Sequence, residues 1–505
     1  MTSKYSKIAA AVFALAALAA VSARAQSTDP LAAATQKALN ANPEVTARFN
    51  AFRAAADAVD AARAGYLPRL DMQGIVGTTN DRIESRLPQT DTLPHSGVSL
   101  TVTQMLWDGL LTSSEVGRLG HEKLARYFEF VDVSEQTALA VTTAWYDVLR
   151  YRKLVSLAED NYVQHKYTLN QIQSRVRAGV GRGVDYEQAL ARMTLAESNL
   201  VTEVANLHDV TARYQRLVGE APPAQMAMPP AMLKAFPANA DEATGLSLRR
   251  NAAISASVET LRAARETTTG RKSAFQPTLQ ARLRTGVGHN YDGVLDQKHD
   301  TTGELVLNWN LFNGGADQAK VKQQANIINQ AADLRDKACR DTRQTVGIAY
   351  NDTKKLAQQL IYLDQNTLSI EKARDAYRQQ FDIGQRNLLD LLNAENELYT
   401  AKRAYANAEY DLGTAQARTQ AAVQQLTAQL GISRIDAGND ASEADKAADW
   451  AGSDDAPMRC PPDPVRLAST TPFSDLDARA QQMTANAPPL PAQRPTPTPP
   501  PTPKK

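Results

Sequence analysis

The sequence predicts an α+β membrane protein built from two internal repeats, each with a helix, two barrel strands, a long helix and a further helix. Three observations give this prediction: one order of motifs that occurs twice, two long proline-free stretches with helical periodicity, and alternating segments ahead of each stretch. In the assembled molecule we expect a homotrimeric transmembrane β-barrel, with four strands per chain, that continues into long α-helical coiled coils.

The repeat is visible as one order of motifs whose second copy begins about 200 residues after the first, a spacing longer than that of solenoid repeats. We place the first repeat at residues 26–221, a linker at 222–245 and the second repeat at 246–432. The matching motifs are Asn42-Pro43-Glu44-Val45 with Asn251-Ala252-Ala253-Ile254, Tyr66-Leu67-Pro68 with Phe275-Gln276-Pro277, and Leu106-Trp107-Asp108-Gly109 with Leu311-Phe312-Asn313-Gly314.

The first 25 residues have the pattern of a secretory signal peptide. Lys4 and Lys7 precede an apolar stretch from Ile8 to Val21, and Ala23-Arg24-Ala25 follows as a small-x-small cleavage site. No cysteine lies near this point, so we expect no lipid anchor on the mature N-terminus. No later segment reaches the roughly 20 apolar residues of a membrane helix, so any membrane crossing is expected to use strands.

Composition argues against several other classes of protein. Lys and Arg number 56 against 55 Asp and Glu, and this balance gives no reason to expect nucleic acid as a partner. The six histidines form no ligand pattern, and we find no nucleophile with a base, so no metal, cofactor or enzyme activity is predicted. Cys339 and Cys460 lack cysteine or histidine partners at metal-ligand spacing, and we interpret both as incidental.

Two long helical hairpins are expected where proline is absent, at residues 95–221 and 278–456. A proline inside a helix costs about 3 kcal/mol, and apolar residues recur at three and four positions in both stretches. The first long helix should run over 109–178, and about 70 helical residues span roughly 100 Å. The returning helices are expected over 185–217 and 388–430, packed along the long ones.

Four strand-like segments precede these helices in two pairs, joined by polar segments at 81–96 and 291–302 that we expect to be outer loops. Four strands cannot close a barrel, and open edges would leave backbone groups unpaired in lipid. Three copies would supply about twelve strands, enough to enclose a lumen. The expected strands are Arg69 to Asn80, Val98 to Thr103, Thr278 to Asn290 and Leu305 to Leu311.

The stretch from Phe381 to Tyr399, FDIGQRNLLDLLNAENELY, resembles the TolC-like outer-membrane channel proteins of Gram-negative bacteria, in particular those of type I protein secretion. The resemblance covers nearly all of Leu31 to Gly431. It implies a homotrimer whose barrel in the outer-membrane lipid continues into a helical tunnel across the periplasm. It also implies that the tunnel's closed end opens when a periplasmic adaptor and an inner-membrane ABC transporter dock.

The same resemblance implies which residues close and open the tunnel. Phe381 replaces a hydrogen-bonding tyrosine of better-known channels and Asn393 replaces an acidic residue, so the latch should be weaker here. The gate positions are Asp185, Phe381, Arg386, Asp390 and Asn393. The hairpin tips expected to meet the adaptor are Gly179, Gly181, Gly183, Gly384 and Gln385, with Gly179 and Gly384 at helix C-caps.

The aspartates at the gate have a second interpretation. Under threefold symmetry, three Asp390 carboxylates would repel one another unless each pairs with Arg386. Alternatively, Asp185 and Asp390 simply begin their helices, where a side-chain oxygen caps free amides and the charge meets the helix dipole. The glycine-rich run at 179–183 has no preceding strand and no following Lys-Ser/Thr, so a hairpin tip is favoured over a phosphate loop.

A separate tail is expected over 433–505, because more than half of the chain's 25 prolines fall between Pro457 and Pro503. It should be disordered or polyproline-like. For the whole chain three functions remain open. They are a duct for type I protein secretion, an outer-membrane factor that serves small-molecule efflux with an RND pump, and a periplasmic coiled-coil scaffold.

Overall fold

The computed structural model describes residues 29–82, 84, 90–291, 295–436, 460 and 471–485 of the 505-residue chain. The signal peptide predicted at 1–25 and most of the tail predicted at 433–505 lie outside these residues. The chain divides into two units, residues 1–461 and 462–505. The second unit contains one described helix, α13 (Phe473–Ala485).

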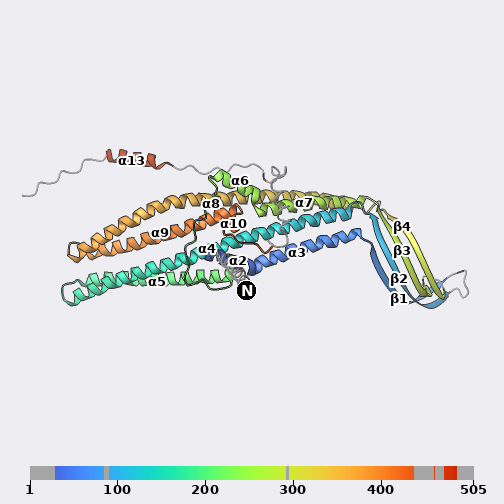
Figure 1. Cartoon of the computed structure of the whole chain (residues 1–505), viewed down its shortest axis with the longest axis horizontal. Coiled ribbons are helices and arrows are strands. Elements are labelled where there is room, and N and C mark those ends of the chain that lie inside the picture. Colours follow the sequence, from blue (N-terminus) through green and yellow to red (C-terminus); the bar gives the residue numbers. More distant parts are fainter. Residues whose placement is uncertain are drawn as a thin grey trace, which may run out of the picture. The chain divides into compact units, whose positions relative to one another are not determined.

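The first unit contains one order of elements twice (Figure 1). The first copy comprises α2 (Pro30–Ala41), α3 (Pro43–Arg63), β1 (Arg69–Arg82), β2 (Thr90–Trp107), α4 (Leu111–Arg177) and α5 (Gly183–Val218). The second comprises α6 (Ala240–Arg250), α7 (Ala252–Lys272), β3 (Thr278–His289), β4 (Gln297–Asn308), α8 (Ala316–Asp382) and α9 (Leu388–Ala422), followed by α10 (Leu426–Gln429). The two long helices, α4 and α8, have 67 residues each.

The recurring asparagine that opens each motif series is a helix cap. The side chain of Asn42 accepts a hydrogen bond from Glu44 N at 2.9 Å and so begins α3. The side chain of Asn251 accepts one from Ile254 N at 3.1 Å and begins α7. Both helices have 21 residues, so the same local signal begins matching elements in the two copies.

The strands form one antiparallel sheet in the order β1-β2-β3-β4. The pairing register places apolar side chains on one face and polar side chains on the other. The apolar face includes Leu70, Met72, Val98, Leu100, Val102, Leu283, Leu305 and Leu307, and the polar face includes Asp71, Gln73, Ser99, Thr101, Thr103, Arg282, Arg284 and Glu304. Met72 is 75% exposed and Leu305 is 72% exposed in the single chain.

The strand ends differ from the predicted ones. β2 begins at Thr90 and β4 at Gln297, inside the segments 81–96 and 291–302 that were expected to be loops. β4 also ends at Asn308 instead of Leu311. Backbone pairing continues through these polar residues because a ladder requires N–H and C=O groups, whereas the prediction relied on apolar alternation.

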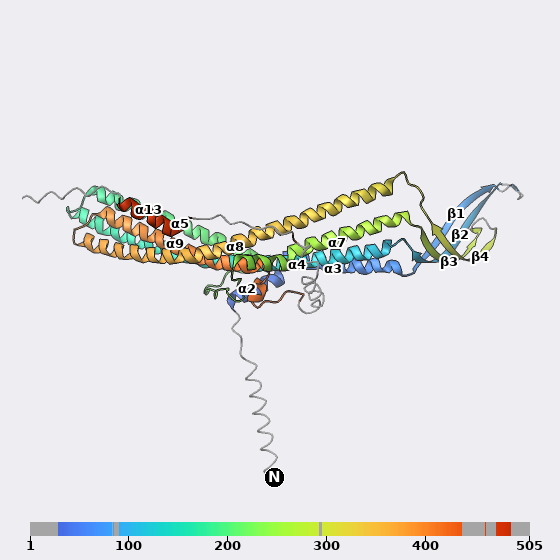
Figure 2. The ribbon, with the colours of Figure 1, turned by 90° about the horizontal axis from the view of Figure 1, so that it is seen from above.

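The helices form two hairpins, α4 with α5 and α8 with α9, and α4 packs along α9 (Figures 1 and 2). The sheet lies at the end of α4 and α8 opposite to the hairpin turns. One buried cluster between α4 and α9 contains Leu154, Leu157, Ala158, Tyr399 and Ala406. Within the described residues, no helix is both long enough and apolar enough to cross a membrane.

The helix expected over 388–430 is divided into α9 and α10. Gln424 has φ of 57° between them, and the Ser247 hydroxyl donates to the carbonyl of the residue that ends α9. The carboxylate of Glu135, 3% exposed, accepts a hydrogen bond from Leu426 N at 2.6 Å and so begins α10. Ser247 and Glu135 belong to other helices, so the sequence near the break between α9 and α10 gives no signal for it.

Cys339 and Cys460 form a disulfide, so their interpretation as incidental is wrong. Cys339 is fully buried and packs with Ile254 and Val258 of α7. Spacing along the chain gave no signal, because the two cysteines meet only where the chain returns beside α8. A cross-link between residues 121 positions apart restricts the unfolded chain by about 5 kcal/mol in the chain-entropy account.

Gly413 of α9 allows close contact with α4. A Cβ at this position would lie 2.6 Å from the ring of Tyr146, which is 1% exposed. We therefore expect Gly413→Ala to lower the free energy of unfolding by about 1–3 kcal/mol, as in other overpacked cores. Denaturant unfolding of the purified protein measures the change.

Gly347 of α8 is the matched control, because a Cβ there meets nothing within 4 Å. Gly347→Ala should leave the stability equal or raise it slightly, since alanine favours helix. Equal unfolding midpoints for Gly413→Ala and Gly347→Ala would contradict the close packing of α4 on α9.

Candidate functional site

The two hairpin turns have the same backbone design. Gly179 and Gly384 adopt φ of 77° and 79°, in the left-handed region that favours glycine. Val180 N bonds to Arg175 O at 3.1 Å, and Gln385 N bonds to Gln380 O at 2.8 Å. These hydrogen bonds are those of a Schellman motif, which ends a helix at a left-handed residue. Both glycines therefore end their long helices as predicted.

Gly181 and Gly183, the other predicted tip residues, lie in the α4–α5 turn. A Cβ at Gly181 would lie 2.8 Å from Val176 N, so this turn is tight enough to require glycine. Gly183 is the first residue of α5, and a Cβ there would meet nothing within 4 Å. The first turn therefore requires a second glycine, Gly181, although the backbones of the two turns are alike.

Asp185 and Asp390 each lie in the first turn of their helix but do not cap it with their side chains. The cap of α9 is Asn387, whose side chain accepts from Asp390 N at 2.8 Å. At α5 the cap residue is Arg182, with no side-chain cap bond. The expected side-chain capping is therefore wrong, and what remains is a negative charge near each helix start.

Arg386 and Asp390 form an ion pair within one chain. Arg386 Nη1 lies 3.2 Å from Asp390 Oδ2, one helical turn away. Arg386 Nε also donates to Gln380 Oε1 at 3.0 Å, and its guanidinium lies 4.2 Å from the ring centroid of Tyr377. The arginine is thus held over the second hairpin turn by three partners from that hairpin.

Phe381 joins the two hairpins through packing. It is 5% exposed and belongs to a cluster to which all four hairpin helices contribute. The guanidinium of Arg175, from α4, lies 5.0 Å from its ring centroid, a cation–π arrangement. The other buried members of the cluster are Leu169, Ile172, Ala189, Met193, Leu388, Leu391 and Leu392.

Asn393 joins the hairpins through a hydrogen bond. Its Oδ1 accepts from Arg192 Nη2 of α5 at 3.0 Å. The donor is charged, and such bonds are stronger than neutral ones. Asn393 therefore contacts the other hairpin. Nothing in the sequence marks Arg192 as the partner of Asn393.

Further polar contacts join the two hairpins, and the sequence did not indicate them. Arg403 of α9 pairs with Glu203 of α5, which is 2% exposed. Arg378 Nη2 of α8 donates to Gln164 Oε1 of α4 at 2.7 Å, and Arg150 pairs with Asp411 across α4 and α9 at 2.9 Å. These partners lie far apart in sequence, and each arginine resembles an ordinary surface residue when it is read alone.

The paired carboxylates make these contacts costly to break. Between the hairpins, the 2% exposed Glu203 pairs with Arg403. Within the second hairpin, the 5% exposed Glu395 receives Arg378 at 2.6 Å and Arg374 at 3.4 Å. Removal of one partner from a buried ion pair leaves an uncompensated charge and costs about 3–5 kcal/mol. The arrangement therefore holds the two hairpins together by ionic and polar contacts whose separation requires replacement partners.

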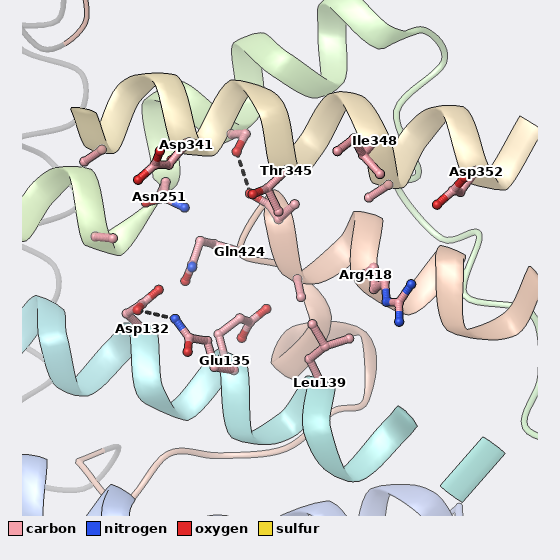
Figure 3. A pocket seen from close by; sticks show the side chains of 18 residues that line it. Asp132, Glu135, Leu139, Asn251, Asp341, Thr345, Ile348, Asp352, Arg418 and Gln424 are labelled. Carbon is pink, nitrogen blue, oxygen red and sulfur yellow. Dashed lines mark hydrogen bonds between the residues drawn. The ribbon is translucent and has the colours of Figure 1, made fainter. Parts of the chain in front are cut away.

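A cavity of about 590 Å³ lies between α4 and α8, away from the hairpin turns. The end of α9 and the start of α7 also line it (Figure 3). Burial raises the pKa of Asp132 to about 6, and burial also raises the pKa of Glu135 against the hydrogen bonds that it accepts. None of the predicted gate residues lines this cavity. Its charged lining residues are Asp132, Glu135, Asp341, Asp352 and Arg418.

Comparison with known proteins identifies the family. A sequence model described as outer membrane efflux protein matches residues 34–220 and 244–431. The chain belongs to the outer membrane efflux protein family. It is therefore an outer-membrane export channel protein with a periplasmic extension. Membership of this family favours the two channel alternatives over the periplasmic scaffold.

Similar proteins include one described as an efflux protein and one described as a secretion protein. The outer membrane efflux protein BepC of Brucella suis is 24% identical over 408 residues, 80% of this chain and 88% of BepC. The proteases secretion protein PrtF of Dickeya chrysanthemi is 27% identical over 303 residues, 57% of this chain and 64% of PrtF. The crystal structure of the outer membrane channel CmeC of Campylobacter jejuni shares the fold, with a TM-score of 0.71 and 14% identity over 83% of this chain and 89% of CmeC.

His165 should make the stability of the hairpins depend on pH. It lies on α4, 3% exposed, and burial together with the nearby charge of Arg192 lowers its pKa to about 4. The unfolded chain, with an ordinary pKa near 6.5, binds more protons between these values. The free energy of unfolding should therefore fall by roughly 3 kcal/mol as the pH decreases from about 6.5 to about 4.

Urea unfolding over this pH range measures the effect, with two variants for comparison. His165→Gln should reduce the pH dependence, whereas His208→Gln, at an exposed position of α5, should keep it. An unchanged slope in His165→Gln would show that another group causes the dependence.

Proposed function

We propose that the chain forms a homotrimeric export duct and serves as the outer-membrane component of a type I protein secretion system. Three chains would contribute four strands each to one barrel of about twelve strands, wide enough for a lumen. The helical hairpins of the three chains would form a coiled-coil tunnel across the periplasm. A periplasmic adaptor and an inner-membrane ABC transporter would dock at the tips Gly179, Gly181, Gly183, Gly384 and Gln385.

The sheet supports the barrel in two ways. Its apolar face is exposed in the single chain, as a lipid-facing surface must be, and its polar face suits a water-filled lumen. β1 and β4 are the edge strands of the sheet, and edges within lipid must be paired. Pairing of β1 of one chain with β4 of the next would satisfy both edges in a closed ring.

The contacts between the hairpins support a gate at the periplasmic end. Phe381 and Asn393 of the second hairpin contact Arg175 and Arg192 of the first, so a docking partner that separates the hairpins must replace these contacts. Around a threefold axis, Asp390 would form a ring of carboxylates. The local pair with Arg386 would reduce their mutual repulsion in the closed state.

Asp185 would contribute a second acidic ring, and its environment differs from that of Asp390. Gly181 stands four residues before Asp185, where the second hairpin has Arg386 before Asp390. Arg182 lies three residues before Asp185, but within the described residues no ion pair joins them, so a ring at Asp185 would lack the local neutralisation that Arg386 gives Asp390. This difference supports a cation preference at the entrance, because an acidic ring without local neutralisation attracts cations.

The similarity to PrtF, whose description names protease secretion, is the observation that carries the secretion assignment. The stretch from Phe381 to Tyr399, which resembles type I secretion channels, supports it. The similarity to BepC, described as an efflux protein, favours a second candidate function. In that alternative the same duct would serve small-molecule efflux with an RND pump.

Deletion of the gene distinguishes the two functions. If the chain serves secretion, one or more proteins should disappear from the culture medium and accumulate in the cells, because their exit is lost. Mass spectrometry of medium and cells measures this redistribution, and the wild-type gene supplied in trans should reverse it.

The efflux alternative predicts a different result in the same strains. The set of proteins in the medium would then stay the same, and the deletion strain would accumulate toxic small molecules and become more sensitive to them. That outcome would overturn the secretion assignment and would leave the channel fold intact.

A further inference from the structure

Asn290, just after β3, is hydrogen-bonded to Asp296 and to β2. Asn290 and Asp296 adopt φ of 50° and 62°. Asn290 N donates to Asp296 O at 2.7 Å, and Asp296 N donates to Asn290 Oδ1 at 3.0 Å. The side-chain amide of Asn290 also donates to Pro94 O of β2 at 2.8 Å. The chain at Tyr291 is therefore held against the end of the sheet that lies far from the helices.

Tyr291 lies on a surface made of glycines. A Cβ at Gly97 would lie 2.5 Å from its ring, and a Cβ at Gly288 would lie 2.6 Å from the tyrosine Cβ. A Cβ at Gly286 would lie 3.5 Å from the ring. Any side chain at Gly97 or Gly288 would displace Tyr291, so these glycines allow its close approach.

The strand register shows which face of the sheet the tyrosine covers. Gly97 pairs with Gly288, and their side-chain positions fall on the face that also carries Arg284. Val287, between the two β3 glycines, points to the opposite, apolar face and is 43% exposed. Tyr291, which is itself 2% exposed, therefore lies on the polar face.

Two cations flank the ring on this face. Arg284 Nη2 donates to the Tyr291 hydroxyl, and its guanidinium lies 5.5 Å from the ring centroid. Lys298 Nζ of β4 lies 5.9 Å from the same centroid. Both distances suit cation–π contacts. The hydroxyl bond and the two cations hold the bulk of the tyrosine against the polar face.

We infer that Tyr291 narrows the duct at the end opposite to the hairpin tips and so limits the size of solutes that pass there. The inference rests on the proposed function, because the polar face is the lumen only in a closed barrel. Three tyrosines, one from each chain, then reduce the lumen at one level. The export duct thus has a second narrow point, separate from the periplasmic gate.

The test uses a thiol placed below this level. Thr103 lies on the polar face of β2, nearer to the helices than Gly97. The chain's two cysteines are paired in the disulfide, so Thr103→Cys supplies the reactive thiol. Intact cells that carry the full-length protein are treated from outside with a small charged methanethiosulfonate and with maleimides linked to polymers of graded size.

We expect the small reagent to modify the thiol at the same rate in Thr103→Cys with and without Tyr291→Ala. The largest polymer that reacts should be larger in Tyr291→Ala, because the ring no longer occupies the lumen. The matched control is Val287→Ala, which removes a side chain from the opposite face of the same strand. Its size limit should equal that of the protein with Tyr291 intact.

The two possible failures are distinguishable. An equal polymer size limit with and without Tyr291→Ala, while the small reagent reacts in both, would overturn the inference and leave the duct intact. No reaction of the small reagent in either variant would show that the polar face is not a water-filled lumen. That result would contradict the proposed barrel and the inference together.

Discussion

The packing of α4 against α9 is the interaction on which the rest of the structure depends, because it joins the two repeats along their hairpins. Its core buries Tyr146 and Leu154 of α4 against small and aromatic residues of α9. Close approach at Gly413 brings the backbones together. Toward the tips the same alignment places charged side chains of one hairpin beside acceptors of the other, and the proposed gate uses those contacts.

The two copies share a scaffold and differ at the residues that suit a gate. Each long helix ends at a left-handed glycine, and each returning helix has an aspartate in its first turn. Arg386 stands one turn before Asp390, whereas the equivalent position before Asp185 is Gly181. Asn393 contacts the first hairpin. Duplication therefore explains the architecture, and divergence between the copies gives only the second hairpin an arginine four residues before its first-turn aspartate.

Much of the fold could be predicted from the sequence because it depends on local signals. Proline-free periodic stretches indicated α4 and α8, the motif order indicated the duplication, and Gly179 and Gly384 indicated where the long helices end. The rest depends on residues that meet only in three dimensions. Arg192 gives no sign that Asn393 is its partner, and the break after α9 is made by Glu135 and Ser247. The pairing of the two cysteines was likewise invisible in their spacing.

The central claim is that contacts between the hairpins of one chain help to close the proposed duct, and single-channel conductance of the purified protein in planar bilayers tests it most directly. Arg192→Met removes the exposed, charged hydrogen bond to Asn393 in each chain without leaving a buried charge. Arg63→Met is the control, because Arg63 pairs only one helical turn away, with exposed Asp60 of α3. The account predicts a larger conductance for Arg192→Met than for the wild type and Arg63→Met. Equal conductance of all three channels would contradict it.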